Sequence, residues 1–548
     1  MSLTSRLLAR LLRLPPAETY DLVVTRDLKI TMPDGVVLLA DHYAPRTGPR
    51  RPTILVRSPY GRSGFFGALT ARPYAERGYQ VLIQSCRGTA GSGDQFAYAR
   101  NEHSDGMATI EWIKQQDWFT GELGMAGPSY LGFVQWSVAA EAGPELKVLV
   151  PQITSSDFNR FRFQGGTMTL ESSLDWSTMM TEQAATGMQL GSLLRQRSRQ
   201  RRLELAYQHL PLKEADQVAI GKTSAIFQEV LAHAPDDTYW RPIDYSPTVG
   251  DVQAPIALMA GWYDLFLDWQ LKDYQRLRAA GQHPTLLIGP WFHGEVSSFG
   301  PMTRETLAWL NAHLKGDRSG LRAAPVRLLV MGTNEWRDFA DWPPPATIER
   351  WHLQPGGGLQ LAAPPESAPD QYHYDPADPT PAVGGNSLGN RKRMGAKDNR
   401  GLEARRDVLV YTSPVLADDV EIIGPVTAEL YVKSSLEFTD FFARLCVVAR
   451  SGRSTNLCDG ILRLCPGQPP SERDSTRKIR IELWPTAYHF RKGERLRLQV
   501  SSGAHPRFAR NLGSGESLAS GSTLNVADQT VYHDPDHPSA LLLPIYTR

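Results

Sequence analysis

The segment Gly127-Pro128-Ser129-Tyr130-Leu131-Gly132 constrains this chain more than any other short stretch. It is a G-x-S-x-G pattern with one extra residue before the last glycine. In a strand-turn-helix elbow, small neighbours let the backbone pack closely, and the turn pushes the serine hydroxyl out of the sheet. The pattern therefore predicts an α/β sheet with Ser129 exposed as a nucleophile. Taken alone the pattern is weak, because glycine and serine are common in ordinary turns.

The sequence on both sides supports the elbow. Gly124 to Ala126 can form a short buried strand before it, and Phe133 to Ala140 can run as a helix after it. Upstream, Asp105 to Gln116 carries apolar residues at helical spacing. A helix, a strand and an elbow form one unit of an α/β sheet, with the N-terminus of the next helix directed at Ser129.

Length and composition limit the other possibilities. A chain of 548 residues is too long for one compact core, so two or three domains are expected. The hydrophobic content of 41% and the charged content of 21% are ordinary for a soluble globular protein. A net charge of +1 gives no reason to expect nucleic acid or an anionic membrane as a partner.

The cysteines and the N-terminus bear on the cellular setting. The four cysteines lack a metal-site spacing and are interpreted as free thiols of a cytoplasmic protein, although a Cys458–Cys465 disulfide is an alternative. The chain contains no run of about 18 apolar residues, so no transmembrane helix is expected. Leu3 to Leu14, which contains three arginines, is expected to be an amphipathic helix packed on the protein's own surface, with a weak membrane anchor as the alternative.

Three segments can be distinguished along the chain. Residues 1–150 and 251–315 contain short buried-strand runs that alternate with helical stretches, which predicts a parallel sheet. Residues 151–250 lose the strand signals and are expected to form an inserted helical cap. Residues 316–548 contain many short β-rich runs between turn signals, Val326 to Met331 among them, and predict an all-β sandwich or jelly roll.

A serine nucleophile needs a base and an acid. In α/β-hydrolases these follow in the order Ser, Asp, His, each at the carboxyl end of a strand. The strand-like run Ala254 to Ala260 leads to Asp264, and Pro284 to Ile288 leads to His293. Asp264 and His293 are therefore the candidates for the acid and the base. Asp268 is a rival acid, but it falls past the strand end.

Two histidines near the C-terminus are candidates for a metal site. His533 and His537 flank Asp534-Pro535-Asp536. Such turns are common on protein surfaces and no third set of ligands is visible, so neither a metal nor another cofactor is expected.

The expected roles follow from these positions. His293 would take the proton of Ser129 during attack on a carbonyl carbon, and Asp264 would hold the imidazole. The backbone N–H of Tyr130 would be one oxyanion donor. The usual His-Gly-Gly-Gly donor loop is absent, and Ser58-Pro59-Tyr60-Gly61 stands at its place.

A group of short segments points to a known family: Ser58 to Gly61, Cys86 to Thr89, Gly127 to Gly132, Gly261 to Asp264, Gly289 to His293 and Pro506 to Asn511. On these segments the chain resembles the cocaine esterase / X-Pro dipeptidyl-peptidase family of serine hydrolases, over nearly its whole length. The resemblance implies an α/β-hydrolase fold with an inserted helical cap and a C-terminal jelly-roll domain. It also implies that the Tyr60 phenol donates to the oxyanion, and it suggests a homodimer through the β domain.

The resemblance also bears on the substrate. It places Phe163, Trp176 and Phe266 in the acyl pocket, although they could equally belong to the core of the cap. Relatives that hydrolyse α-amino acid esters carry acidic residues just after the triad aspartate, whereas this chain has Leu265-Phe266-Leu267. The expectation is a serine esterase for small hydrophobic or aromatic acyl esters. The alternatives are an X-Pro dipeptidyl-peptidase, a β-lactam or amide acylase, and an inactive carbohydrate-binding jelly-roll protein.

Overall fold

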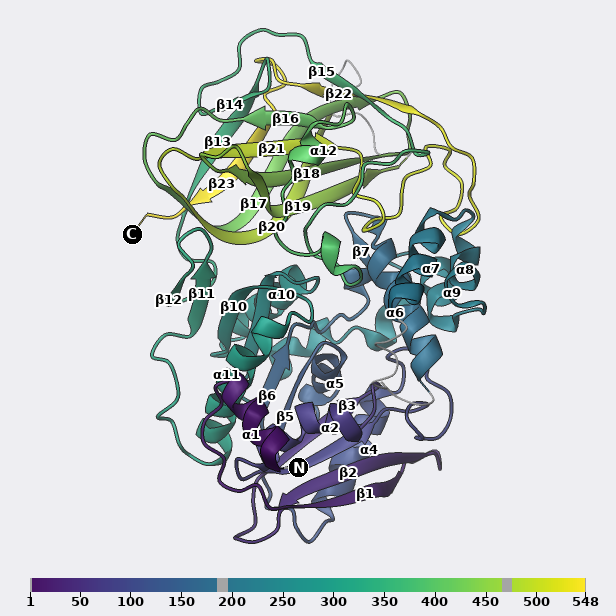
Figure 1. The fold of residues 1–548 in the computed structure, drawn as a ribbon, viewed down its shortest axis with the longest axis vertical. Coiled ribbons are helices and arrows are strands. Elements are labelled where there is room, and N and C mark those ends of the chain that lie inside the picture. Colours follow the sequence, from purple (N-terminus) through teal and green to yellow (C-terminus); the bar gives the residue numbers. More distant parts are fainter. Residues whose placement is uncertain (1, 185–195, 466–475, 548) are drawn as a thin grey trace.

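The computed structural model describes residues 2–184, 196–465 and 476–547. An α/β domain occupies one end of the molecule and an all-β domain the other, with a group of cap helices beside their junction (Figure 1). This architecture is the α/β-hydrolase fold with an inserted cap and a C-terminal β domain that the sequence predicts.

The α/β domain is built on a ten-stranded sheet of order β1-β2-β4-β3-β5-β6-β9-β10-β11-β12. Neighbouring strands from β4 to β11 run parallel, and the pairs at both edges are antiparallel. The strands are β1 (Leu22–Thr31), β2 (Val37–Pro45), β3 (Thr53–Ser58), β4 (Gln80–Ser85), β5 (Leu123–Pro128), β6 (Leu146–Gln152), β9 (Ala257–Tyr263), β10 (Thr285–Phe292), β11 (Val326–Val330) and β12 (Glu335–Phe339).

The central strands are apolar throughout because both faces of the sheet are covered. On β3, Ile54 and Val56 belong to one core cluster, while Leu55 between them belongs to the other. Helix α11 packs into the first cluster and helices α4 and α10 into the second, so side chains on both faces leave water. The helices of this domain are α1 (Ser2–Leu11), α2 (Gly64–Thr70), α3 (Arg72–Ala75), α4 (Glu102–Lys114), α5 (Tyr130–Ala139), α10 (Leu267–Ala279) and α11 (Val296–Leu314).

The cap connects β6 to β9. It is mainly helical, as expected, and adds a short hairpin that rests on the C-terminal domain, where the backbone N–H of Arg463 donates to Gly165 O at 2.7 Å. Its elements are β7 (Phe163–Gln164), β8 (Thr167–Met168), α6 (Leu170–Gln183), α7 (Gln196–Gln208), α8 (Ala215–Ile220) and α9 (Ala225–Ala232).

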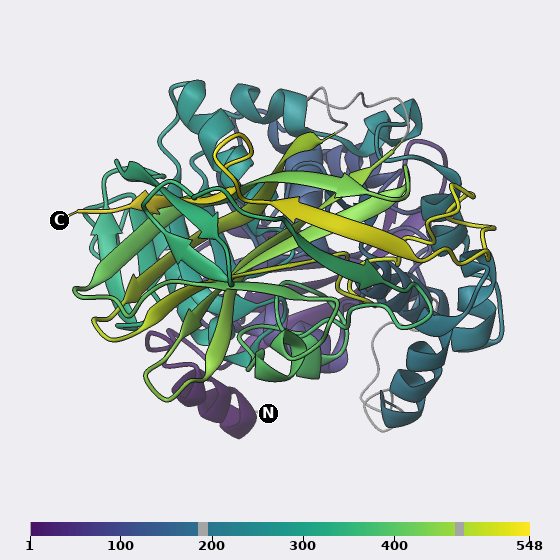
Figure 2. The same ribbon diagram turned by 90° about the horizontal axis from the view of Figure 1, so that it is seen from above.

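The C-terminal domain consists of long, mostly antiparallel strands that lie over the α/β domain when the molecule is seen from above (Figure 2). Its elements are β13 (Thr347–Gln354), β14 (Gly358–Gln360), β15 (Asp370–Tyr374), α12 (Arg400–Glu403), β16 (Leu409–Thr412), β17 (Val420–Ser434), β18 (Thr439–Val448), β19 (Ser454–Leu464), β20 (Arg477–Phe490), β21 (Arg495–Ser501), β22 (Ala527–Tyr532) and β23 (Ala540–Ile545).

The structure corrects one assignment made from the sequence. Val326 to Met331 was expected in the all-β domain, but β11 pairs in parallel with β10 and extends the first sheet, and β12 then folds back against it. An apolar run of five residues can pair with any open sheet edge. The open edge of β10 therefore determines which sheet this strand joins, and the sequence of the run does not.

The N-terminal helix α1 lies against the start of α11. Arg304 Nη1 donates to Leu12 O at 2.6 Å, which ties the end of α1 to α11. Leu7 and Leu11 are 69% and 74% exposed, so only part of the helix packs on the protein. None of the helices in the described part of the chain combines the length and the apolar composition that a membrane span requires.

All four cysteines are free thiols in the structure. Cys86, Cys446 and Cys458 are buried, and Cys465 is exposed. The alternative disulfide between Cys458 and Cys465 is therefore not formed.

Candidate active site

Ser129 occupies a sharp turn between β5 and α5. Its backbone has φ 58° and ψ −124°, a conformation rarely adopted by a residue with a side chain, and its N–H donates to Gln152 O at 2.8 Å. A Cβ at Gly132 would lie 2.5 Å from Cγ2 of Thr154, and one at Gly127 would lie 2.6 Å from Cβ of Leu131. The glycines of the motif are therefore required by close packing on both sides of the serine.

Three side chains from separate strand ends form a hydrogen-bonded line. Nδ1 of His293, which follows β10, lies 2.8 Å from Oδ2 of Asp264, which follows β9. Nε2 of His293 lies 3.1 Å from Oγ of Ser129. Asp264 also accepts a hydrogen bond from the backbone N–H of Phe266 at 2.9 Å, which orients its carboxylate. This arrangement can carry a proton away from the serine hydroxyl.

The two rival assignments fall elsewhere in the structure. Asp268 lies in the first turn of α10, where it pairs with Lys272 at 2.6 Å. The ring of His533 is buried and hydrogen-bonded through both nitrogens, to Asp370 at 3.0 Å and to Ser367 Oγ at 2.9 Å. No cluster of three or more metal-ligating side chains occurs in the part of the chain that the structure describes.

Two hydrogen-bond donors lie beside Ser129. Tyr130 is the first residue of α5, so its N–H has no acceptor within the helix. The Tyr60 hydroxyl accepts a hydrogen bond from Nε1 of Trp176 at 3.1 Å and interacts with the Ser129 side chain. Burial raises the pKa of Tyr60 to about 12, so the phenol is a neutral donor at pH 7. Because Trp176 donates to its oxygen, the Tyr60 hydrogen is available for an acceptor.

A buried network that the sequence analysis missed anchors Tyr130. Its hydroxyl donates to Oε1 of Glu102 at 2.8 Å, and Glu102 forms an ion pair with Arg57 at 2.9 Å. The side chains of Arg57 and Glu102 are 0% and 5% exposed. An arginine inside the apolar strand β3 is the one signal that could have pointed to a buried acidic partner. The identity of that partner depends on how α4 packs against the strand.

Aromatic side chains surround this group of residues. The ring of Trp176 stacks on Tyr130 at 6.0 Å, and the ring of Phe266 lies 5.6 Å from that of His293. Of the three residues expected in the acyl pocket, these two lie beside the Ser129 line. Phe163 lies on β7 and lines a small cavity with Leu265. Two aromatic residues missed by the sequence analysis, Phe158 and Phe161, pack on Phe266 at 5.3 and 5.0 Å.

Comparison with known proteins identifies the family of this chain. An α/β-hydrolase fold that carries a serine at its elbow defines the class of serine hydrolases. The profile described as X-Pro dipeptidyl-peptidase (S15 family) matches residues 34–295. The profile described as X-Pro dipeptidyl-peptidase C-terminal non-catalytic domain matches residues 320–542. The chain belongs to this S15 family of serine hydrolases, as the resemblance predicts.

Individual relatives extend the similarity over nearly the whole chain. Cocaine esterase from Rhodococcus sp. (strain MB1 Bresler) is 32% identical, and the alignment covers 96% of this chain and 99% of the esterase. An aminopeptidase from a marine sediment Thaumarchaeota archaeon has a similar structure, with a TM-score of 0.81, 20% identity and coverage of 97% and 98%. An α-amino acid ester hydrolase gives a TM-score of 0.80 with 21% identity and coverage of 97% and 98%. These two structures share the fold.

Proposed function

We propose that this serine hydrolase is a carboxylesterase that cleaves small hydrophobic or aromatic acyl esters. The proposal assigns Ser129 as the nucleophile, His293 as the general base and acid, and Asp264 as the residue that orients the imidazole. The observation that carries it is the hydrogen-bonded line from Asp264 Oδ2 through both nitrogens of His293 to Ser129 Oγ.

In the proposed mechanism, Nε2 of His293 takes the hydroxyl proton as Ser129 Oγ forms a bond to the ester carbonyl carbon. The same proton passes to the leaving alkoxide as the bond between carbon and alcohol oxygen breaks. In deacylation His293 deprotonates a water molecule as its oxygen attacks the acyl carbon, and the proton then passes to Ser129 Oγ as the bond from that oxygen to the acyl carbon breaks. Asp264 keeps the proton on Nδ1 and stabilises the imidazolium formed in each half-reaction.

Charge on the carbonyl oxygen develops in the transition state. The Tyr130 N–H at the helix N-terminus and the Tyr60 hydroxyl are proposed to bind this oxyanion. The high pKa of Tyr60 supports its role, because the phenol keeps its proton over the pH range in which an imidazole acts as a base. Trp176 supports the geometry by fixing the direction in which the Tyr60 hydrogen points.

The proposed substrate preference rests on the residues next to Asp264 and Ser129. Leu265, Phe266 and Leu267 are buried at the place where, by the family resemblance, hydrolases of α-amino acid esters carry acidic residues. Trp176, contributed by the cap, adds an apolar wall beside the nucleophile. An apolar acyl group fits this environment without leaving a charge unpaired.

A substrate panel with the variant Ser129→Ala tests the proposal. The panel contains p-nitrophenyl acetate, butyrate and benzoate beside Ala-Pro-p-nitroanilide. We expect the wild type to hydrolyse the esters faster than the anilide, and we expect Ser129→Ala to lose at least about 10⁴-fold in kcat. Ser137→Ala, in the helix α5 that follows Ser129, is the matched control and should retain activity.

Two outcomes would contradict parts of the proposal. Faster cleavage of the anilide than of any ester would identify an X-Pro dipeptidyl-peptidase, the activity for which the family is named. Unchanged ester hydrolysis in Ser129→Ala would remove the nucleophile assignment.

A further inference from the structure

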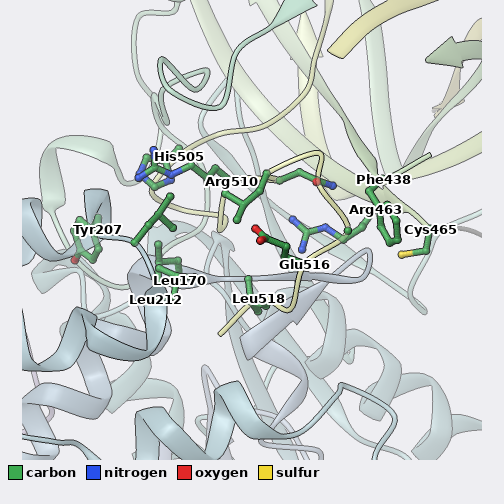
Figure 3. A pocket seen from close by; sticks show the side chains of 14 residues that line it. Leu170, Tyr207, Leu212, Phe438, Arg463, Cys465, His505, Arg510, Glu516 and Leu518 are labelled. Carbon is green, nitrogen blue, oxygen red and sulfur yellow. The ribbon is translucent and has the colours of Figure 1, made fainter. Parts of the chain in front are cut away.

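A second cavity lies at the junction of the cap and the C-terminal domain (Figure 3). Its volume is ≈ 190 Å³, and none of the residues named at the candidate active site lines it. The cap contributes the start of α6, the end of α7 and the loop that follows. The C-terminal domain contributes the segment from His505 to Leu518.

Most of the wall is apolar. Aliphatic side chains line the cavity from both the cap and the C-terminal domain, so the apolar part of a bound ligand would be buried on several sides. These side chains are Leu170, Leu210, Leu212, Leu512 and Leu518.

Two polar side chains at one end are incompletely paired. His505 is 5% exposed, and neither of its ring nitrogens makes a hydrogen bond of normal geometry to a described residue, although the backbone of Phe508 interacts weakly with the ring. The side chain of Arg510 lies close to it in Figure 3. Burial, reinforced by the charges of Arg510 and Arg393, lowers the pKa of His505 to about 3, so the imidazole is neutral at pH 7. A buried polar group without a hydrogen bond of normal geometry is uncommon and marks a place for an additional hydrogen bond.

Arg510 has hydrogen bonds but no counter-ion. It donates to the backbone carbonyls of Pro376 at 3.0 Å and of Gln208 at 2.7 Å. Among the described residues it forms no ion pair, and partial burial lowers its pKa. The carbonyls satisfy part of its hydrogen-bonding capacity but leave its charge uncompensated.

The other two charged side chains of the wall already have partners within the protein. Arg463 pairs with both oxygens of Asp440 at 2.8 Å. Glu516 is exposed and accepts hydrogen bonds from the backbone N–H groups of Ser522 and Thr523. Arg510 is therefore the one lining cation in the described structure that lacks a carboxylate.

We propose that this cavity binds a small monocarboxylate with an apolar body. The carboxylate would pair with Arg510 and accept a hydrogen bond from His505, and the body would lie against the leucines. An apolar cavity of about 150 Å³ can bind benzene, so a volume of ≈ 190 Å³ suits an acid of butyrate or benzoate size. The proposal does not depend on the reaction assigned to Ser129.

Calorimetric titration of the full-length protein with benzoate tests this site, and benzamide serves as the uncharged probe of the same shape. We expect benzoate to bind the wild type and Arg510→Gln to bind it at least about tenfold more weakly, because a charge-assisted hydrogen bond is lost. Benzamide should bind both proteins equally weakly. Arg480→Gln, an exposed arginine on β20, is the matched control and should bind benzoate as the wild type does.

A second variant, Leu212→Trp, fills the cavity while keeping Arg510, and it should also abolish benzoate binding. It decides the question if Arg510→Gln proves unfolded by circular dichroism. The proposal is overturned if benzoate fails to bind the wild type at tens of millimolar, or if it binds Arg510→Gln or Leu212→Trp as tightly as the wild type. The last result would be expected if benzoate occupied only the catalytic centre.

Discussion

The proposed role of Tyr60 depends on one group, its hydroxyl, which is the second donor to the oxyanion. We expect Tyr60→Phe to lower kcat by about 10² to 10³ with little change in KM, since the interaction is made mainly in the transition state. Steady-state kinetics with p-nitrophenyl butyrate measure the effect. Tyr532→Phe, a tyrosine on β22, is the control. A kcat of Tyr60→Phe within twofold of the wild type would place this role elsewhere.

Trp176 is proposed to position Tyr60 through the hydrogen bond from its indole N–H. Trp176→Phe keeps an aromatic ring but removes that donor, and we expect kcat to fall by about 2- to 10-fold. The double variant with Tyr60→Phe should be no worse than Tyr60→Phe alone, since the indole then has no hydroxyl to orient. Independent, multiplicative losses in this kinetic cycle would mean that Trp176 acts only as a pocket wall.

At the scale of an element, the start of α5 is held by the contact between Tyr130 and Glu102. Tyr130→Phe removes the hydrogen bond to the charged Glu102 and also the acceptor of the Ala99 backbone N–H, so we expect it to lower the free energy of unfolding by at least about 1.5–3 kcal/mol. Its backbone N–H remains, and kcat should fall less than in Tyr60→Phe. Glu102→Gln leaves Arg57 buried without a counter-charge and should cost about 3–5 kcal/mol. Urea unfolding measures both, and equal stability of the two variants would contradict this account.

Sequence patterns predict some of the strands and their neighbours correctly and fail for others. The elbow, β9 and β10 are recognisable because each is a short apolar run that ends in a distinctive group of residues. The run that forms β11 is equally apolar, yet the prediction that it belongs to the C-terminal domain is wrong. Five residues do not contain the information about which sheet has an open edge. The partner of Arg57 was missed for a related reason, since Glu102 lies 45 residues away on α4.

At the scale of the whole molecule, Arg393 joins the C-terminal domain to the cap by pairing with Glu171 at 2.6 Å and with Glu204 at 3.0 Å. The side chain of Glu171 is fully buried, and burial raises its pKa even though Arg393 opposes the shift. Arg393→Gln should therefore lower the free energy of unfolding at pH 8 by about 3–5 kcal/mol.

The pH dependence of this variant has a definite sign. Without Arg393 the pKa of Glu171 rises further, so the native state retains a proton that the unfolded state has lost over a wider pH range. Stability then falls as pH rises through that range, and the difference between variant and wild type should shrink when the pH is lowered from 8 to 5. Thermal unfolding at the two pH values measures it. A constant difference would show that the charge on Glu171 is not the cause.

Local sequence patterns were enough to predict the class of fold, the location of the elbow and the order of the residues that join it: glycines around a serine in a tight turn, and apolar strands that end in Asp264 and His293. Only the folded chain shows which aromatic residues lie beside Tyr130 and His293, which buried charges pair, and that Arg510, which lacks a counter-ion among the described residues, contacts the cap. Those features depend on the packing of segments far apart in the chain, and local propensity carries no record of which surfaces will meet.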